Sequence, residues 1–236
     1  MKRKAVFFDL DDTLYSGFPE GDAEGFVRCG QYAAANCGVS AEAFTARIRQ
    51  AREDLKVVLP REPEIHDRTL VAQQALEAFG INPIPHAEAM HDLYWSAVFD
   101  HMIVRPGAAD FLTELRERGV KVGVCTNMLV GIQMRKLYRL GLADKVDFLV
   151  TSEESGRDKP DSPIFELSLK KAGCTPAEAL MVGDNFTHDI IGAHRVGIDG
   201  LWLHVHGEPS VTADFPFLEA ADFYQAADLI RSALDN

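Results

Sequence analysis

The chain is expected to fold as a doubly wound α/β protein, a parallel sheet with helices on both faces, into which an all-helical domain is inserted. Three observations predict this architecture. The chain opens with a short apolar run that ends in a cluster of aspartates, nearly ninety residues without a buried-strand pattern follow, and helical and strand patterns alternate through the remainder. Such alternation is typical of parallel sheets, because parallel strands need crossover connections.

The first strand is predicted over Ala5, Val6, Phe7 and Phe8, which lead directly into Asp9-Leu10-Asp11-Asp12-Thr13. Side chains alternate along an extended segment, so Asp9 and Asp11 start on one face, roughly 6 to 7 Å apart. Two carboxylates this close repel each other unless a cation binds them. A divalent metal with oxygen ligands would leave one carboxylate as a nucleophile and the other as a proton carrier. An acidic turn without chemistry is the alternative interpretation.

The segment after Leu14 is predicted to be helical and to form a domain of its own over residues 17–102. The rest of the chain, residues 1–16 and 103–236, is then expected to form the core. Prolines mark loops between the helices. The four predicted helices run from Glu24 to Asn36, Ala41 to Leu55, Asp67 to Phe79 and Ala87 to His101.

After residue 105 the patterns of helix and strand alternate, and glycines end most of the helices. The predicted strands are Val120 to Thr126, Asp147 to Thr151, Ala179 to Val182 and Leu201 to Val205, which gives five strands with the first one. The predicted helices are Ala108 to Arg118, Val130 to Leu140, Ser162 to Ala172, Thr187 to Val196 and Ala220 to Leu234. A capping box beginning at Thr175 marks a further short turn.

Polar side chains follow the strand ends. Thr126 and Asn127 end the second strand, Lys159 follows the third, and Asp184 and Asp189 follow the fourth. In open parallel sheets ligands bind beyond the carboxyl ends of the strands, so these residues are expected to meet Asp9 and Asp11 at one edge. Each residue alone could be a cap or a solvated loop residue, but their joint occurrence favours a functional site.

The ordered set resembles the haloacid dehalogenase superfamily of phosphohydrolases over nearly the whole chain. Asp9 to Leu14 is similar to the first motif of that family, Thr126 to its second and Lys159 to its third. Gly183-Asp184 with Asp189 is similar to its fourth motif. The helical segment resembles the mobile helical cap of the family, which implies hinges near Tyr15 to Phe18 and Val104 to Gly107 and a catalytic role for the core.

The resemblance implies a phosphatase that uses Asp9 as the nucleophile and forms an aspartyl phosphate. Asp11 would protonate the leaving oxygen and later accept a proton from water. Mg²⁺ would be held by the Asp9 carboxylate, the Asp11 backbone carbonyl and Asp184, with Asp189 in or just behind the ligand set. Thr126, Asn127 and Lys159 would bind the phosphoryl oxygens, and Lys159 would also neutralise the nucleophile.

The implied substrate is a small phosphorylated metabolite, a sugar phosphate or a nucleotide, and three alternatives stay open. A phosphomutase would use the same residues. A 2-haloacid dehalogenase would use the first aspartate but would need no second one, because halide leaves without a proton. From a different class, a phospho-acceptor signalling module also combines aspartates with Thr and Lys, although in another order and a shorter chain.

Composition limits the partners and the compartment. The net charge of −12 argues against nucleic acid and anionic membranes as partners. No apolar run is long enough to span a membrane, and the four cysteines form no CxxC pair, so no disulfide framework or zinc site is predicted. A cytoplasmic protein is therefore expected, while the sequence gives no indication of oligomeric state.

Overall fold

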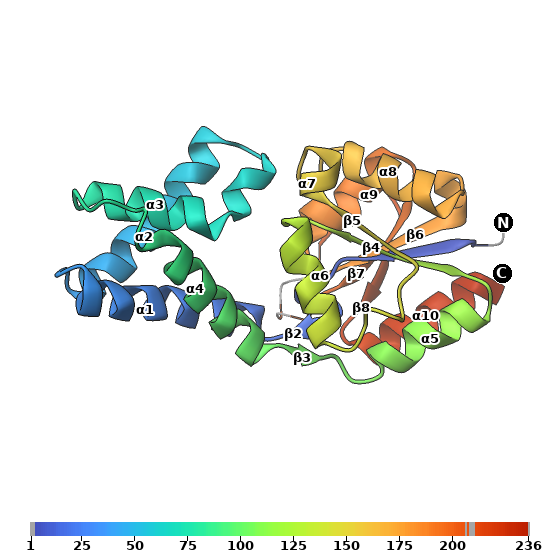
Figure 1. Cartoon of the computed structure of the whole chain (residues 1–236). Coiled ribbons are helices and arrows are strands. Elements are labelled where there is room, and N and C mark those ends of the chain that lie inside the picture. Colours follow the sequence, from blue (N-terminus) through green and yellow to red (C-terminus); the bar gives the residue numbers. More distant parts are fainter. Residues whose placement is uncertain (1–2, 206, 208–210, 236) are drawn as a thin grey trace. The chain divides into compact units, whose positions relative to one another are not determined.

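The computed structural model describes residues 3–205, 207 and 211–235. The chain divides into two compact units, Met1–Ser16 with Ile103–Asn236, and Gly17–Met102 (Figure 1). The first unit contains the sheet, and the second contains the inserted helices.

A six-stranded parallel sheet in the order β5-β4-β1-β6-β7-β8 forms the centre of the first unit. Phe8 aligns with Val124 on one side and Val182 on the other, so the residues that follow these three emerge at the same edge. The strands are β1 Ala5–Phe8, β4 Lys121–Thr126, β5 Phe148–Thr151, β6 Ala179–Gly183, β7 Asp199–Leu203 and β8 Leu218–Ala220.

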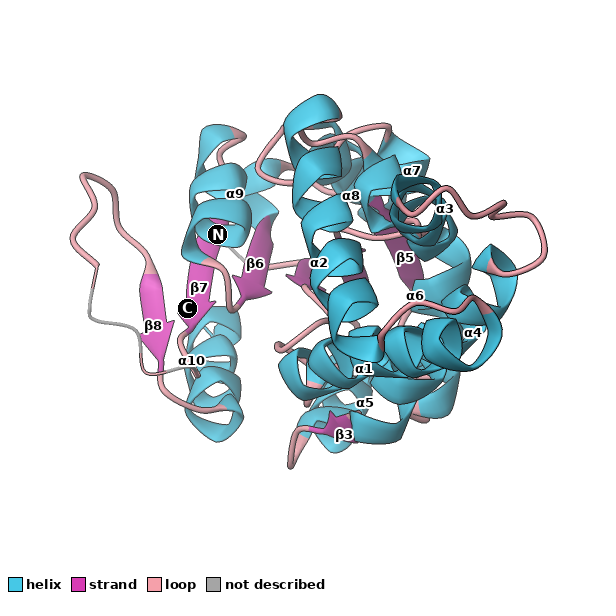
Figure 2. Ribbon diagram, turned by 90° about the vertical axis from the view of Figure 1, so that its left-hand side faces the viewer, coloured by secondary structure: helices cyan, strands magenta, loops and turns pink. Residues whose placement is uncertain are grey.

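Helices cover both faces of this sheet, which confirms the doubly wound fold. The helices α5 Ala108–Glu117 and α10 Phe223–Asp235 lie on one face, and α8 Pro163–Ala172 and α9 Gly192–Arg195 lie on the other (Figures 1 and 2). The remaining helices are α6 Val130–Arg139, which follows β4, and the short α7 Ser152–Ser155. β1 and β6 are buried along their whole length, which explains their continuous apolar sequences.

Three local predictions were wrong. The sheet has six strands because Leu218–Ala220 pairs with β7, so the terminal helix begins at Phe223 and not at Ala220. The helix predicted from Thr187 is a π-helical segment, Phe186–Ile191, continued by α9. Two short strands, β2 Tyr15–Ser16 and β3 Ile103–Val104, pair at the base of the insertion, where helix or hinge was expected.

The second unit consists of the helices α1 Phe18–Asn36, α2 Ala41–Val58, α3 Arg68–Ala78 and α4 Ala87–His101, with a 3-10 turn at Pro63–His66. The helix α1 begins six residues before its predicted start, because Pro19 is accepted in the first turn. It packs against α2 and α4, with the rings of Phe26 and Tyr94 5.1 Å apart. The predicted all-helical insertion is thus confirmed.

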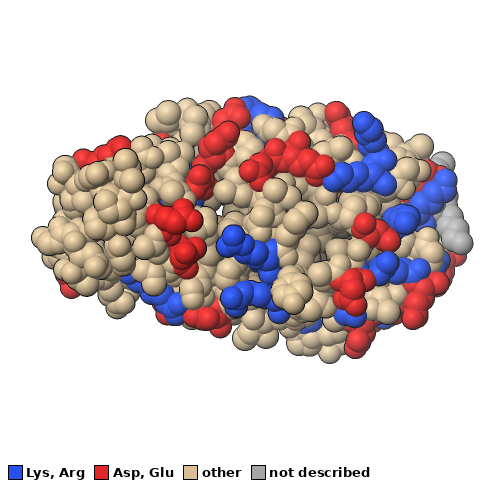
Figure 3. Space-filling model, in the orientation of Figure 1, with Lys and Arg blue, Asp and Glu red and all other residues tan. Residues whose placement is uncertain are grey.

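Charged side chains are distributed over the surface of the described residues. On the face of the described residues that Figure 3 shows, acidic and basic side chains are interspersed and form no continuous basic region. Within residues 3–205, 207 and 211–235, no helix combines the length and apolar character needed to cross a bilayer.

Candidate active site

Asp9 lies directly beyond β1, at the centre of the sheet edge. Its backbone N–H donates a hydrogen bond to the carbonyl of Val182 in β6 (2.8 Å), so the ladder of the sheet fixes its position. The residue is only 7% exposed. Burial is the main cause that raises the pKa of Asp9 to about 6, with Lys159 opposing the rise and Asp189 adding to it.

Lys159 joins three strand ends through one buried ammonium group. Its Nζ lies 2.7 Å from Oδ1 of Asp9 and 2.6 Å from Oδ1 of Asp189, and it donates to the carbonyl of Cys125 at 2.9 Å. Burial opposes its charge, but Asp189 and Asp9 outweigh burial and raise the pKa of Lys159. The ammonium therefore stays charged beside Asp9 at neutral pH.

Asn127 holds the backbone of Lys159 in place. The side-chain Oδ1 of Asn127 accepts a hydrogen bond from the Lys159 N–H (2.7 Å), and its Nδ2 donates to the Lys159 carbonyl (3.2 Å). The side-chain amide of Asn127 thus pairs with the backbone of Lys159, in the loop after β5. The family resemblance implied that Asn127 binds phosphoryl oxygens.

Asp184 is oriented by Thr13, a residue of the first motif. The Thr13 hydroxyl donates to Oδ1 of Asp184 (3.1 Å) and accepts from the Asp184 N–H (3.0 Å). The indole of Trp202 also donates to the Asp184 carbonyl (2.8 Å). Burial, and then Asp9 and Asp189, raise the pKa of Asp184 to about 9.

The carboxylates of Asp9, Asp184 and Asp189 form a cluster that fits a divalent cation. One oxygen from each lies within 4.8 Å of the other two. Both Asp189 oxygens already accept hydrogen bonds, Oδ1 from Lys159 and Oδ2 from the N–H of Asn185 (3.0 Å). Oxygen donors of this kind suit Mg²⁺, and the pKa values of Asp9 and Asp184, raised first by burial and then by neighbouring carboxylates, show that a cation would stabilise the ionised forms.

Gly183 allows Asp189 to reach this cluster. A Cβ at position 183 would lie 2.1 Å from Oδ2 of Asp189 and 2.2 Å from its Cγ. The glycine is therefore required by the close approach of the Asp189 carboxylate to the end of β6.

Asp11 occupies a different environment, in which three donor groups contact its carboxylate. Tyr15 Oη donates to Oδ1, Gln133 Nε2 donates to Oδ2 at 3.0 Å, and the ammonium of Lys136 is paired with Oδ1. Burial alone would raise the pKa of Asp11, but Lys136 and these hydrogen bonds outweigh it and hold the pKa below its ordinary value. Gln133 Nε2 also donates to the hydroxyl of Thr126 (2.8 Å), which links the Asp11 carboxylate to the end of β4.

All seven residues singled out in the sequence meet at the carboxyl edge of the sheet through these contacts. Four other residues of the site were not predicted from the sequence to have a role: Thr13, Tyr15, Gln133 and Lys136. Thr13 belongs to the first motif. Lys136 is completely buried, yet its place in the last turn of an amphipathic helix is also typical of an exposed basic residue. No motif marks Gln133 or Lys136 in the sequence, so only the fold brings them to Asp11.

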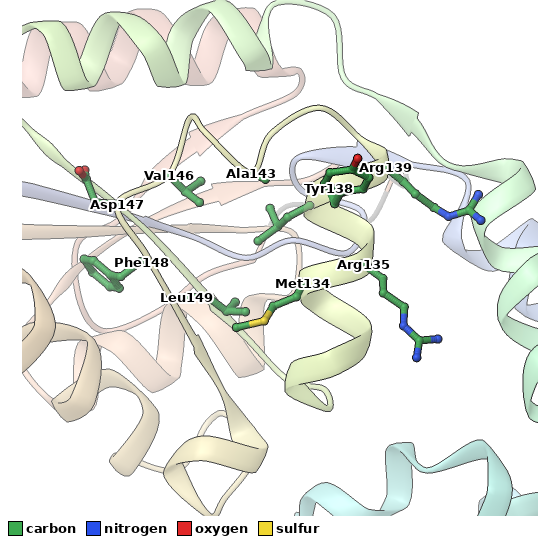
Figure 4. A pocket seen from close by; sticks show the side chains of 10 residues that line it. Met134, Arg135, Tyr138, Arg139, Ala143, Val146, Asp147, Phe148 and Leu149 are labelled. Carbon is green, nitrogen blue, oxygen red and sulfur yellow. The ribbon is translucent and has the colours of Figure 1, made fainter.

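A cavity of about 570 Å³ lies elsewhere on the first unit, between α6 and β5 (Figure 4). Met134 and Tyr138 line it, and they point nearly opposite to Gln133 and Lys136 at the helical angle of about 100° per residue. The cavity is therefore separate from the polar cluster. Its lining consists of Met134, Arg135, Leu137, Tyr138, Arg139, Ala143, Val146, Asp147, Phe148 and Leu149.

Comparison with known families and proteins agrees with this arrangement. The model of the haloacid dehalogenase-like hydrolases matches residues 3–197. The ribulose-1,5-bisphosphate 5-phosphatase of Halopiger xanaduensis is 38% identical, over 88% of this chain and 87% of its own length. The glyceraldehyde 3-phosphate phosphatase of Methanothermobacter thermautotrophicus is 32% identical, over 85% of each chain.

Among solved structures, a HAD phosphatase from Thermococcus onnurineus has a TM-score of 0.75 at 24% identity, covering 96% of this chain and 97% of its own. A 2-haloacid dehalogenase from Pseudomonas syringae pv. Tomato has a TM-score of 0.74 at 26% identity, covering 98% and 99%. Phosphatases and dehalogenases thus share the fold, and only the residues of the site and the sequence relatives distinguish the two activities.

Proposed function

This chain belongs to the haloacid dehalogenase-like hydrolases, and we propose that it is a Mg²⁺-dependent phosphatase in which Asp9 attacks phosphorus. It is a phosphatase of small phosphorylated metabolites, as its relatives over most of the chain are. The single observation that carries the assignment of Asp9 is its contact with the buried ammonium of Lys159, 2.7 Å from Oδ1. That contact keeps the carboxylate ionised at the centre of the sheet edge.

The reaction proceeds in two steps, each with a role for Asp11. In the first step a carboxylate oxygen of Asp9 bonds to phosphorus, the bond to the leaving alcohol breaks, and Asp11 gives that alcohol a proton. In the second step water bonds to phosphorus, the bond to Asp9 breaks, and Asp11 takes up the proton that water loses. The hydroxyl of Thr126 and the ammonium of Lys159 stabilise the negative charge of the phosphoryl oxygens.

Asp9 and Asp184 would hold Mg²⁺ together with the Asp11 backbone carbonyl, and Asp189 would support the site from behind. Both Asp189 oxygens already accept hydrogen bonds, from Lys159 and from the Asn185 N–H, which favours this indirect role. When bound, Mg²⁺ supplies charge stabilisation for the transferring phosphoryl group.

We propose a short phosphorylated sugar or a related carbonyl compound as the substrate, with a nucleotide as the second class. The names of the two relatives support the first class. Dehalogenation is disfavoured because the site contains a second aspartate, Asp11, and a departing halide needs no proton carrier.

A phosphate-release screen with Mg²⁺ tests the proposal. The panel contains glyceraldehyde 3-phosphate, ribulose 1,5-bisphosphate and pyrimidine nucleoside monophosphates, with a 2-haloacid assayed for halide. We expect phosphate release to be fastest from one of the sugar esters and no halide to appear. Transfer of phosphate to a second position of the sugar without release would identify a mutase. Halide release without phosphatase activity would refute the proposal.

A further inference from the structure

Lys136 is a fully buried lysine that none of the four motifs includes. It lies on α6, and its ammonium contacts Oδ1 of Asp11. The ring of Tyr15, whose hydroxyl binds the same carboxylate, has its centroid 5.9 Å from the Lys136 Nζ. A buried charge is unfavourable unless a partner compensates it. The contact with Asp11 compensates the charge of this buried ammonium.

Gln133 stands one turn before Lys136 on the same helix and holds the other oxygen of Asp11. Its Nε2 donates to Asp11 Oδ2 (3.0 Å) and to Thr126 Oγ1 (2.8 Å), while its own Oε1 has no hydrogen-bond partner among the described residues. The reverse amide orientation would place an acceptor against the carboxylate, so the donor orientation is the stable one. Because Thr126 accepts from Gln133, its hydroxyl proton remains for donation to another acceptor.

Together the two α6 side chains fix Asp11 at two points. Lys136 binds one carboxylate oxygen and Gln133 binds the other, so the carboxylate can rotate only if one contact breaks. Proton transfer requires the acid within hydrogen-bond reach of the reacting oxygen, and small displacements reduce the rate severely.

We propose that Lys136 and Gln133 are positioning residues that align Asp11 for proton transfer to the leaving alcohol, and that Gln133 also directs the Thr126 hydroxyl toward the phosphoryl group. The inference rests on the proposed phosphatase mechanism and extends it to two residues outside the four motifs. Neither residue touches phosphorus, and both act through Asp11 or Thr126.

Two esters with different leaving groups test this role. The alcohol of glyceraldehyde 3-phosphate needs a proton as it leaves, whereas nitrophenolate leaves p-nitrophenyl phosphate without one. The ratio kcat/KM reports the steps up to release of the leaving group, so it isolates the first proton transfer. We expect Lys136→Met to lower kcat/KM about 10²-fold for the alkyl ester and only a few-fold for the aryl ester. Gln133→Leu should lower both values, since Thr126 also loses its partner, but the alkyl value further.

A double mutant separates positioning from structure. If Lys136 acts through Asp11, Lys136→Met should add little to the loss already caused by Asp11→Asn. A structural role would add its own loss and would affect both esters alike. The control Lys121→Met removes an exposed lysine at the opposite end of β4, paired with Asp147 at 3.5 Å, and should leave both values unchanged.

The losses of kcat/KM on the two esters distinguish the positioning role from the proposed function itself. Equal losses on both esters for the two α6 variants, or no loss, would overturn the inference while leaving the phosphatase assignment intact. A wild-type protein inactive on every phosphate ester would instead refute the proposed function. If thermal unfolding shows that Lys136→Met does not fold, Gln133→Leu provides the test. The inference then requires that this variant lose more kcat/KM on the alkyl ester than on the aryl ester.

Discussion

Asp9 and Asp11 are two residues apart, yet their surroundings shift their pKa values in opposite directions. Burial and neighbouring carboxylates raise the pKa of Asp9, whereas Lys136, Tyr15 and Gln133 hold the pKa of Asp11 down. Pairs of carboxylates with divergent surroundings are typical of sites that divide two chemical roles between them. The donors around Asp11 stabilise its ionised form, which is the form that takes up the proton of water in the second step.

Replacing either carboxylate by its amide should separate the two roles. We expect Asp9→Asn to lower turnover by roughly 10³-fold or more, because no oxygen nucleophile remains. Asp11→Asn should lower turnover of alkyl phosphates by about 10²- to 10⁴-fold, the usual range for loss of an acid or base. Phosphate release measures both effects, and thermal unfolding checks that the variants are folded. Near-normal release from Asp9→Asn would refute its role as nucleophile.

The chelated protein should lose stability as pH rises, because its site binds protons more tightly when folded. The folded pKa values of about 6 for Asp9 and about 9 for Asp184 exceed the ordinary carboxyl value of 3.8. Above pH 4 the unfolded chain therefore releases protons that the folded chain keeps, and this contribution to stability is lost as pH rises through 6 and then 9.

Melting temperatures measured with chelator from pH 6 to pH 9 test this expectation. We expect the melting temperature to fall by several degrees over this range. Added Mg²⁺ should raise the melting temperature most at high pH, where the cation takes the place of the lost protons. Asp184→Asn removes one titrating group and should flatten the dependence. A melting temperature equally insensitive to pH with and without Mg²⁺ would contradict the metal site.

At the scale of single elements, the sequence was informative where a pattern is long or chemically demanding. The strands β1, β4 and β6 are continuous apolar runs that end in polar motifs, so both their existence and their functional ends could be predicted. The strand β8 has three residues and was not predicted, since a pattern that short has no distinct period. The role of Lys136 was not predicted for another reason, because the sequence does not show which face of α6 lies against the sheet edge.

The π-helical segment Phe186–Ile191 also lies beyond what helical periodicity can predict. It follows Asp184 and places Asp189 against Gly183, where both carboxylate oxygens are used. Segments of this kind occur frequently at functional sites, since the altered turn re-aims one side chain. Here that side chain is Asp189, which accepts a hydrogen bond from Lys159.

Gly183→Ala tests how closely this element is packed. The new methyl group would overlap the Asp189 carboxylate, so Asp189 must move away from Lys159. We expect a destabilisation of about 1–3 kcal/mol, as for other overpacked sites, together with a clear loss of activity. Gly131→Ala is the matched control, because Gly131 lies in α6 with open space around it and should gain up to about 1 kcal/mol. Denaturant unfolding measures the free energy of unfolding of both variants. Equal values for Gly183→Ala and Gly131→Ala would show that the end of β6 tolerates the methyl group.

At the scale of the whole molecule, chemistry and selection of substrate are expected to reside in different units. Every described residue of the candidate site belongs to Met1–Ser16 or Ile103–Asn236. The chain enters and leaves Gly17–Met102 through the paired strands β2 and β3, with only one short connection at each. At Gly17, which has a φ of +100°, a Cβ would lie 2.1 Å from the carbonyl oxygen of His101, so the two connections are tightly packed.

Exchange of the helical unit tests this division of labour. Replacing residues 17–102 by the helical insertion of another family member, with Tyr15–Ser16 and Ile103–Val104 kept, should preserve the strand pair that joins the units. We expect the chimaera to hydrolyse a different set of phosphate esters, because an inserted unit that closes over a site supplies contacts to the leaving group. The Mg²⁺ requirement and the loss caused by Asp9→Asn should not change, since the residues responsible remain. A folded chimaera that ranks its substrates as the parent does would show instead that the core loops select the ester.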